Sequence, residues 1–240
     1  MENNIYLPRA SLLAILLLLL DMRTISLFSF VDLTSVRSDD SRKRQYQKLM
    51  LEELDPTFTP YKRIRPGISK FLRDGFDMAV IEYTLEHNVL PWNPETKRAK
   101  AEKENSLLAL RNILSMPFPS LPGVRFEHRP SYIFKIGGLS LKVSYDAFLS
   151  FRDKDGKNHL GAIKAKIKKD GFMHEDAEMA ACLMYKALQQ QYPDAIVERN
   201  LCLCFNPFTK RMVGANNIDL NYAKALAIAR LLSGTGDVAA

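Results

Sequence analysis

Cysteine is scarce in this chain, and Cys182, Cys202 and Cys204 form neither a disulfide framework nor a zinc motif. An odd and sparse set of cysteines is typical of a reducing compartment. None of the four histidines lies near these cysteines at a spacing typical of a shared metal site. We therefore expect buried, apolar cysteines and a cytoplasmic protein.

An apolar run long enough to cross a membrane is also missing. The run LLAILLLLL at residues 12–20 has about half of the roughly 20 residues that a membrane-spanning helix needs. It fits the apolar part of a signal peptide, but Glu2 precedes it and no A-x-A-like cleavage site follows. Two other interpretations explain the apolar run equally well. It could be a helix packed on the domain, or an extension upstream of a translation start at Met22 or Met50. We expect a helix that does not span a membrane.

The charge surplus is small. Lys and Arg number 34 against 27 Asp and Glu, which gives a net charge of +7. This surplus permits a nucleic-acid or anionic-surface partner without requiring one. Hydrophobic residues make up 47% and charged residues 25% of the chain, values that exclude a wholly disordered, collagen-like or polytopic membrane protein.

Internal repeats, glycine-rich phosphate loops and G-x-S-x-G motifs are absent from the sequence. Residues 37–73 are basic, with ten Lys or Arg against five Asp or Glu, and prolines interrupt them. We divide the chain into an accessory N-terminal region, 1–90, and a main α/β domain, 91–240. The alternative is a single domain with additional elements at its N-terminus.

The second half alternates between helical and strand patterns. Apolar residues at helical spacing predict helices, and short β-branched or aromatic segments between turn signals predict strands. The predicted helices are 96–115, 173–191 and 218–232, and the predicted strands are 124–128, 132–136, 139–151, 158–169, 195–205 and 210–215. This order predicts the α/β class, with a small mixed sheet flanked by helices and a helical N-terminal extension.

The DKDGK segment predicts the register of two of these strands. A three-residue loop at 154–156, with Gly156 in the left-handed conformation, pairs Asp153 with Lys157. The same ladder places Asp146 opposite Lys164 on one face of the sheet. A two-residue turn would shift the register by one and separate these side chains, so the pair depends on the turn type.

An aspartate on one strand and a lysine on the next, between two helices, resembles the restriction-endonuclease-like PD-(D/E)XK superfamily over about residues 96–210. The resemblance implies that Asp146 ligates Mg²⁺ and that Lys164 orients or activates the attacking water. They must lie close together because the metal lowers the pKa of a water beside the scissile phosphate and stabilises the added charge. The resemblance thus implies metal-dependent hydrolysis of DNA phosphodiesters.

One position departs from the motif, because the second acid is expected at residue 162 and Ala162 stands there. A neighbouring helix can supply the acid. Glu104 shares the inward edge of its helix with two leucines, so we assign Asp146 and Glu104 as the metal ligands. Glu178 borders the apolar stripe of its helix, whereas Glu175 points away from it. If none of these reaches Asp146, the domain is a catalytically inactive relative.

Basic residues provide candidate nucleic-acid contacts. Lys166 and Lys168 occupy alternate strand positions after the predicted catalytic lysine, so they point the same way and suit a phosphate backbone. Arg42, Lys43 and Arg44 add a cluster in the basic segment. A solvated strand face and a solvated segment are the alternative interpretations.

Three functions follow from these observations. The first is a Mg²⁺-dependent nuclease-like protein that acts on DNA, with a homodimer left open. The second is an inactive nucleic-acid-binding or assembly module of the same fold. The third is a membrane-associated protein organised by residues 12–20.

Overall fold

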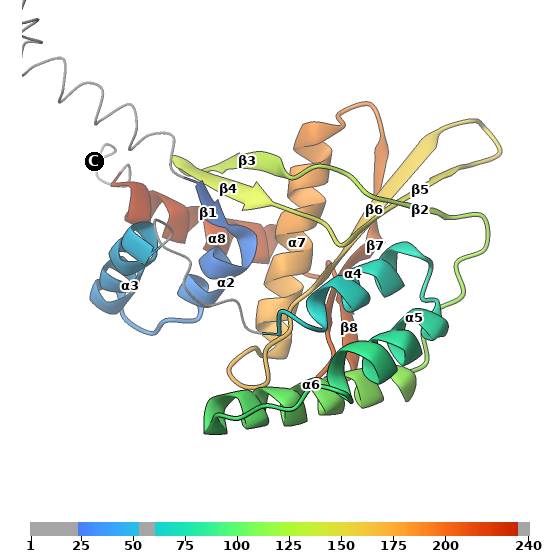
Figure 1. Ribbon diagram of the computed structural model, residues 1–240. Coiled ribbons are helices and arrows are strands. Elements are labelled where there is room, and N and C mark those ends of the chain that lie inside the picture. The colour runs from blue at the N-terminus through green and yellow to red at the C-terminus, as the bar shows by residue number, and fades with distance from the viewer. Residues whose placement is uncertain (1–23, 53–60, 235–240) are drawn as a thin grey trace, which may run out of the picture.

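The computed structural model describes residues 24–52 and 61–234, which form a mixed α/β protein (Figure 1). The predicted α/β class is confirmed at this level. The predicted helix at 12–20 lies outside the described residues. Among the helices that are described, none is long and apolar enough to cross a membrane.

A five-stranded mixed sheet in the order β2-β5-β6-β7-β8 forms the centre of the protein. Its strands are β2 (Arg125–Glu127), β5 (Ala147–Arg152), β6 (Asn158–Ala165), β7 (Ile196–Asn206) and β8 (Arg211–Gly214). Within the described strands of this sheet, β6 and β7 alone pair in parallel. The long helix α7 (His174–Gln191) connects these two strands, because parallel neighbours need a crossover.

A second, three-stranded sheet in the order β1-β4-β3 corrects the prediction of one sheet. Its strands are β1 (Thr24–Ser26), β3 (Tyr132–Ile136) and β4 (Leu139–Val143). The single strand predicted at 139–151 is interrupted at 144–146, so its first part joins this sheet and its second part is β5. The strand-forming pattern is continuous across the interruption, and a side-chain pattern does not report a change of pairing partner.

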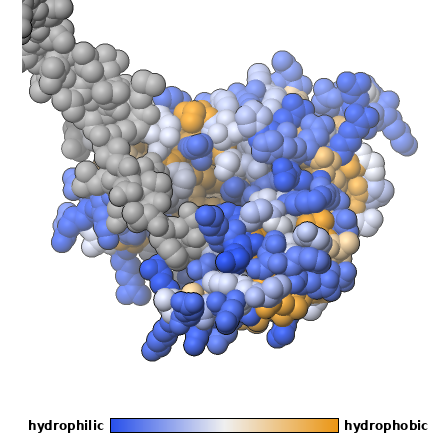
Figure 2. All heavy atoms as spheres, in the orientation of Figure 1, coloured by the Kyte–Doolittle hydropathy of each residue, from blue (hydrophilic) through white to orange (hydrophobic). Residues whose placement is uncertain are grey.

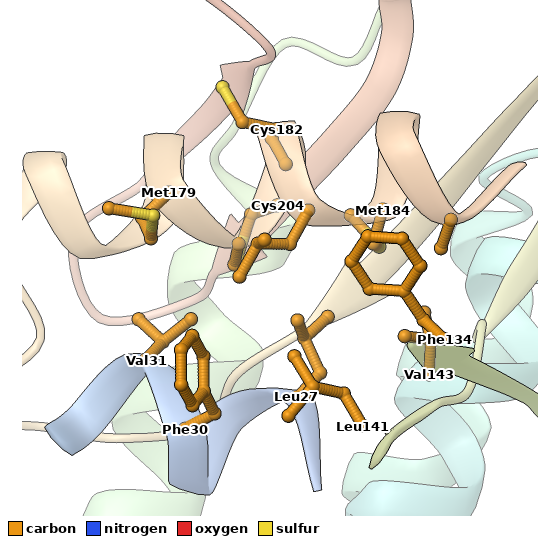
Figure 3. Close-up of a cluster of buried hydrophobic side chains, with 14 of the residues drawn as sticks. Leu27, Phe30, Val31, Phe134, Leu141, Val143, Met179, Cys182, Met184 and Cys204 are labelled. Carbon is orange, nitrogen blue, oxygen red and sulfur yellow. The ribbon is translucent and has the colours of Figure 1, made fainter. Parts of the chain in front are cut away.

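On one face of the large sheet, α7 packs with two further helices and the small sheet. These helices are α2 (Leu27–Thr34) and α8 (Ile218–Ser233). Figure 3 shows how Phe30 and Val31 of α2 meet Met179 and Cys204 in this core. The apolar stripe predicted for 173–191 is therefore buried, as the helical periodicity indicates.

The opposite face is covered by helices from the middle of the sequence. They are α4 (Arg65–Arg73), α5 (Met78–Tyr83), the π-helix η1 (Thr84–Val89) and α6 (Lys97–Leu114). The Thr96 side chain caps α6 by accepting a hydrogen bond from the Ala99 N–H. Ala109, Leu110 and Ile113 of α6 are buried in this second core.

The N-terminal elements contribute to both cores. β1 pairs in parallel with β4, and α2 packs on α7. α4 and α5 belong to the second core, while α3 (Asp39–Glu52) lies at the edge beside α8. Within the described residues, both cores therefore contain elements from 1–90 and from 91–240, and the domain division stays a prediction.

Gly161 marks an irregularity between β6 and β7. The pairing passes from Leu160–Val197 directly to Ala162–Cys202, so residues 198–201 stand opposite this glycine alone. A Cβ atom at Gly161 would lie 2.4 Å from the Leu201 Cβ. Only glycine permits this close approach, which creates a bulge in β7.

Candidate functional site: an aspartate–lysine pair at the ends of two strands

The turn between β5 and β6 has the predicted form. Gly156 adopts a φ of 77° and donates from its N–H to the Asp153 carbonyl at 3.1 Å. The Asp153 N–H donates to the Lys157 carbonyl at 3.1 Å, which closes the three-residue loop. The predicted register is therefore confirmed along the whole hairpin, from Arg152–Asn158 to Ala147–Ile163.

This register brings Asp146 and Lys164 together where β5 begins and β6 ends. The Lys164 Nζ lies 3.5 Å from the Asp146 Oδ2 and donates to the Ser144 Oγ at 3.0 Å. Only 15% of the Lys164 side chain and 12% of the Asp146 side chain are exposed. The pair is thus withdrawn from solvent, where each charge depends on its partner.

The chain itself occupies both oxygens of the Asp146 carboxylate. Oδ1 accepts a hydrogen bond from the Ser69 Oγ of α4 at 2.6 Å. Oδ2 accepts from the Ala165 N–H at 2.8 Å, in addition to its ion pair with Lys164. Asp146 therefore ties α4 to the end of β6 and neutralises a lysine. The role of Ser69 was missed, since nothing in the sequence places it near a strand 77 residues away.

The residues considered as a second metal ligand differ in their surroundings. Ala162 is fully buried in the core below α7. Glu104 is exposed on α6, and Glu175 is exposed at the start of α7. Glu178 is buried, but its Oε1 accepts a hydrogen bond from the Asn217 Nδ2 at 2.9 Å.

Within the described ranges, no group of three His, Cys, Asp or Glu side chains could hold a metal ion. Protein Mg²⁺ sites use one or two carboxylates in near-octahedral oxygen geometry. Asp146 is a single carboxylate, and its oxygens already accept hydrogen bonds. Within the described residues, Asp146 is therefore one carboxylate whose oxygens the chain itself engages, and a Mg²⁺ site with Glu104 as a ligand stays a prediction.

Lys166 and Lys168 are held by an acid from the N-terminal region. Their Nζ atoms lie 3.0 Å from the two carboxylate oxygens of Asp32 on α2. Lys166 also lies over the Phe28 ring, 4.8 Å from its centroid. Burial lowers the pKa of Lys166, and Asp32 opposes this shift. Asp32 thus compensates one of these two positive charges, and it was missed because it is 134 residues from Lys166.

Of the three basic residues predicted to bind nucleic acid on α3, one is buried and two are exposed. Arg42 is buried, donates from Nε to the Leu33 carbonyl at 3.0 Å and pairs with Asp39. Its guanidinium satisfies carbonyl groups at and just after the C-terminal end of α2, and its role as a nucleic-acid contact stays a prediction. Lys43 and Arg44 are exposed on α3.

The cysteines have the predicted character. Cys182, Cys202 and Cys204 are all free and buried. Burial raises the pKa of all three thiols, in the case of Cys182 to about 11, so none is a reactive thiolate.

Fold and site together define a mixed α/β protein with a desolvated aspartate–lysine pair at the ends of two central strands. No protein-family model matches the chain, and no curated protein matches it significantly.

Proposed function

We propose that the chain is a nucleic-acid-binding module with a restriction-endonuclease-like core that does not hydrolyse its ligand. The main support for this proposal is that the Asp146 carboxylate binds groups of the chain itself. It faces Lys164 as in the superfamily motif, but both of its oxygens are engaged by the chain.

The order of elements supports the choice of superfamily. Helix α6 precedes β2, β5 and β6, and α7 then leads to the parallel strand β7. Asp146 immediately precedes β5, and Lys164 lies near the end of the adjacent strand β6, an arrangement similar to that of the motif. The β3–β4 hairpin, inserted between β2 and β5, belongs to the second sheet.

The absence of a second acid supports a non-catalytic role. Hydrolysis in this superfamily needs a metal that activates water and stabilises charge on the phosphate. Position 162 carries a buried alanine, where the second ligand is expected. The remaining pair instead holds α4, β5 and β6 together.

The charge of the chain supports a nucleic-acid ligand. The net charge is +7, and Lys43 and Arg44 are exposed on α3. DNA is the ligand we propose, because the superfamily that the chain resembles acts on DNA. Binding of this electrostatic kind weakens steeply with salt. The free, buried cysteines fit the cytoplasmic location that is part of the same proposal.

An assay of cleavage and binding tests this function. The full-length chain is incubated with linear, circular and single-stranded DNA, with Mg²⁺ or Mn²⁺. We expect no cleavage, together with binding that weakens as salt is raised. Metal-dependent cleavage that is lost in Asp146→Asn but kept in Asp74→Asn would contradict the proposal. Asp74 is a matched control because it pairs with Lys70 at the surface of α4.

An active Mg²⁺-dependent endonuclease is the second candidate function. The 3.5 Å approach of Lys164 to Asp146 favours it, because this pair is the part of the motif that the chain retains. The same assay separates the two candidates, since only the active enzyme cleaves.

A further inference from the structure

A basic groove of about 560 Å³ lies on the α7 face of the large sheet, at the end of β5 remote from Asp146. The sheet continues there past the end of α7, and Figure 1 shows the β5–β6 hairpin extending beyond that helix. Figure 2 shows that hydrophilic residues cover this projecting hairpin. The groove therefore lies apart from the aspartate–lysine pair.

Three arginines line the groove. Arg125 of β2 stands opposite Ser150, and Arg152 is two residues further along the same face of β5. These two are diagonal neighbours, which in an antiparallel pair lie about 7–8 Å apart. Arg129 follows β2, and no acidic residue is found among the described residues that line the groove.

The two strand arginines have free guanidinium donors. Both are exposed, and within the described residues neither forms an ion pair. Arg152 donates from Nε to the Asn158 Oδ1 at 3.1 Å, which uses one of five N–H donors. Arg129 differs, because it pairs with Glu127 at 2.6 Å.

The floor of the groove is apolar. Phe148 lies there with 2% exposure, and the half-buried Tyr192 ring meets it edge-on at 5.7 Å between centroids. The Arg129 guanidinium lies over the same Phe148 ring at 5.2 Å. The groove thus combines phosphate-binding donors with the half-buried Tyr192 ring above an apolar floor, a combination that suits a single-stranded nucleic acid.

We propose that this arginine groove binds one strand of a nucleic acid, one or two nucleotides at a time. Its volume is in the range of small-ligand sites, and it holds a nucleotide unit rather than a duplex. Arg125 and Arg152 bind the phosphates through paired N–H donors, and Tyr192 contacts a sugar or base. The inference rests on the proposed nucleic-acid-binding function and names the site and form of the ligand.

Fluorescence anisotropy of a labelled oligothymidine tests the groove. We expect Arg125→Ala/Arg152→Ala to weaken binding about tenfold or more at low salt. The slope of log affinity against log salt falls by about 1.4, because each lost contact to a single strand removes about 0.7. Arg125→Lys/Arg152→Lys retains part of the affinity, since charge remains but paired donors do not.

A matched control removes the same charge elsewhere. Lys97→Ala/Lys100→Ala changes two exposed residues of α6, and we expect less than about a twofold effect. An equal loss of affinity in this control would overturn the proposed binding site in the groove, because the overall positive charge would then explain binding. An acidic peptide that displaces the oligonucleotide at equal concentration would also overturn it.

Two outcomes separate the groove from the proposed function. If the wild type binds but the arginine double variant binds equally well, the groove is wrong and the function stands. If the wild type binds no nucleic acid at low salt, both are wrong. NMR titration with a thymidine trinucleotide gives independent evidence, since its amide shifts should centre on Ser150, Asn158 and Tyr192. Shifts centred elsewhere would overturn the groove even if the variant fails to fold.

Discussion

The two ends of the β5–β6 hairpin use positive charge in opposite ways. At the end near α2, Lys164, Lys166 and Lys168 each lie within 3.5 Å of an aspartate oxygen. At the other end, Arg125 and Arg152 are exposed and form no ion pair within the described chain. The first group holds elements together, and the second faces a groove. A run of basic residues along a strand therefore does not by itself show whether these residues pair with acids of the same chain or face a ligand.

Desolvation explains the difference. A charge that is largely removed from water needs a partner, whereas an exposed charge does not. Lys164 and Lys166 are 15% and 17% exposed, so their pairing with Asp146 and Asp32 is required by burial. Arg152 at the end of β5 and Arg125 on the neighbouring strand β2 are exposed, so they keep their hydration until a ligand binds.

The largest effect that tests this comparison is expected for Asp146→Ala. The substitution leaves Lys164 desolvated without an acid and leaves the Ser69 hydroxyl and Ala165 N–H without their acceptor. We expect the free energy of unfolding to fall by about 3 kcal/mol, as when one partner of a buried pair is removed. Urea unfolding measures the change.

Asp74→Ala provides the control for that measurement. Its pair with Lys70 is exposed on α4, so the expected loss is below about 1 kcal/mol. An Asp146→Ala protein as stable as the wild type would break the comparison, because a carboxylate that stabilises nothing is more typical of a functional site.

A smaller effect is expected for Asp32→Ala. The substitution removes the acid shared by Lys166 and Lys168. These side chains are 17% and 37% exposed, so water compensates in part and the loss should be about 1–2 kcal/mol. Urea unfolding again measures it, with Asp219→Ala as the control. Asp219 is fully exposed and 4.0 Å from Lys186.

The affinity of the Asp32→Ala protein for nucleic acid tests the comparison in a second way. Two lysines without an acid should raise affinity for an oligonucleotide, provided that the protein remains folded. Unchanged stability together with unchanged affinity would show that Asp32 does not neutralise these lysines.

The smallest effect concerns pH and the hairpin that carries the groove. His159 lies on the other face of β6, between Asp153 at 3.0 Å and Glu198 at 2.7 Å, and stacks on Phe151. Hydrogen bonds to Asp153 and then to Glu198 raise the pKa of His159 above 6.5. Its contribution to stability is thus full below pH 6.5 and is lost as pH rises through the raised pKa.

Thermal unfolding between about pH 5.5 and about pH 8.5 measures this contribution. Relative to His159→Gln, the wild type should lose stability as pH rises. His174→Gln, at an exposed position, should keep the wild-type profile. Parallel profiles for wild type and His159→Gln would show that the two carboxylates do not hold the charged imidazole.

Local sequence signals predicted much of the large sheet. Gly156 selected the three-residue turn, and the turn then determined which residues face each other along the hairpin. Periodic apolar residues located α6, α7 and α8 to within one or two residues. These features are local, so the sequence carries their cause within a few positions.

Long-range features escaped prediction. The interruption at 144–146 moves the chain between sheets without changing its pattern of strand-forming residues. Ser69 and Asp32 reach the ends of β5 and β6 only through packing of the N-terminal helices. The groove combines Arg125 and Arg152 from different strands, and only the register of β2 on β5 brings them together.

We propose that the aspartate–lysine pair is an internal ion pair and not a metal centre. Calorimetric titration of the full-length protein with Mg²⁺, and with Mn²⁺ as a tighter-binding probe, tests this directly. We predict no binding that depends on Asp146, so that wild type and Asp146→Asn give the same heats. Saturable binding to the wild type that disappears in Asp146→Asn, but not in Asp74→Asn, would contradict the account.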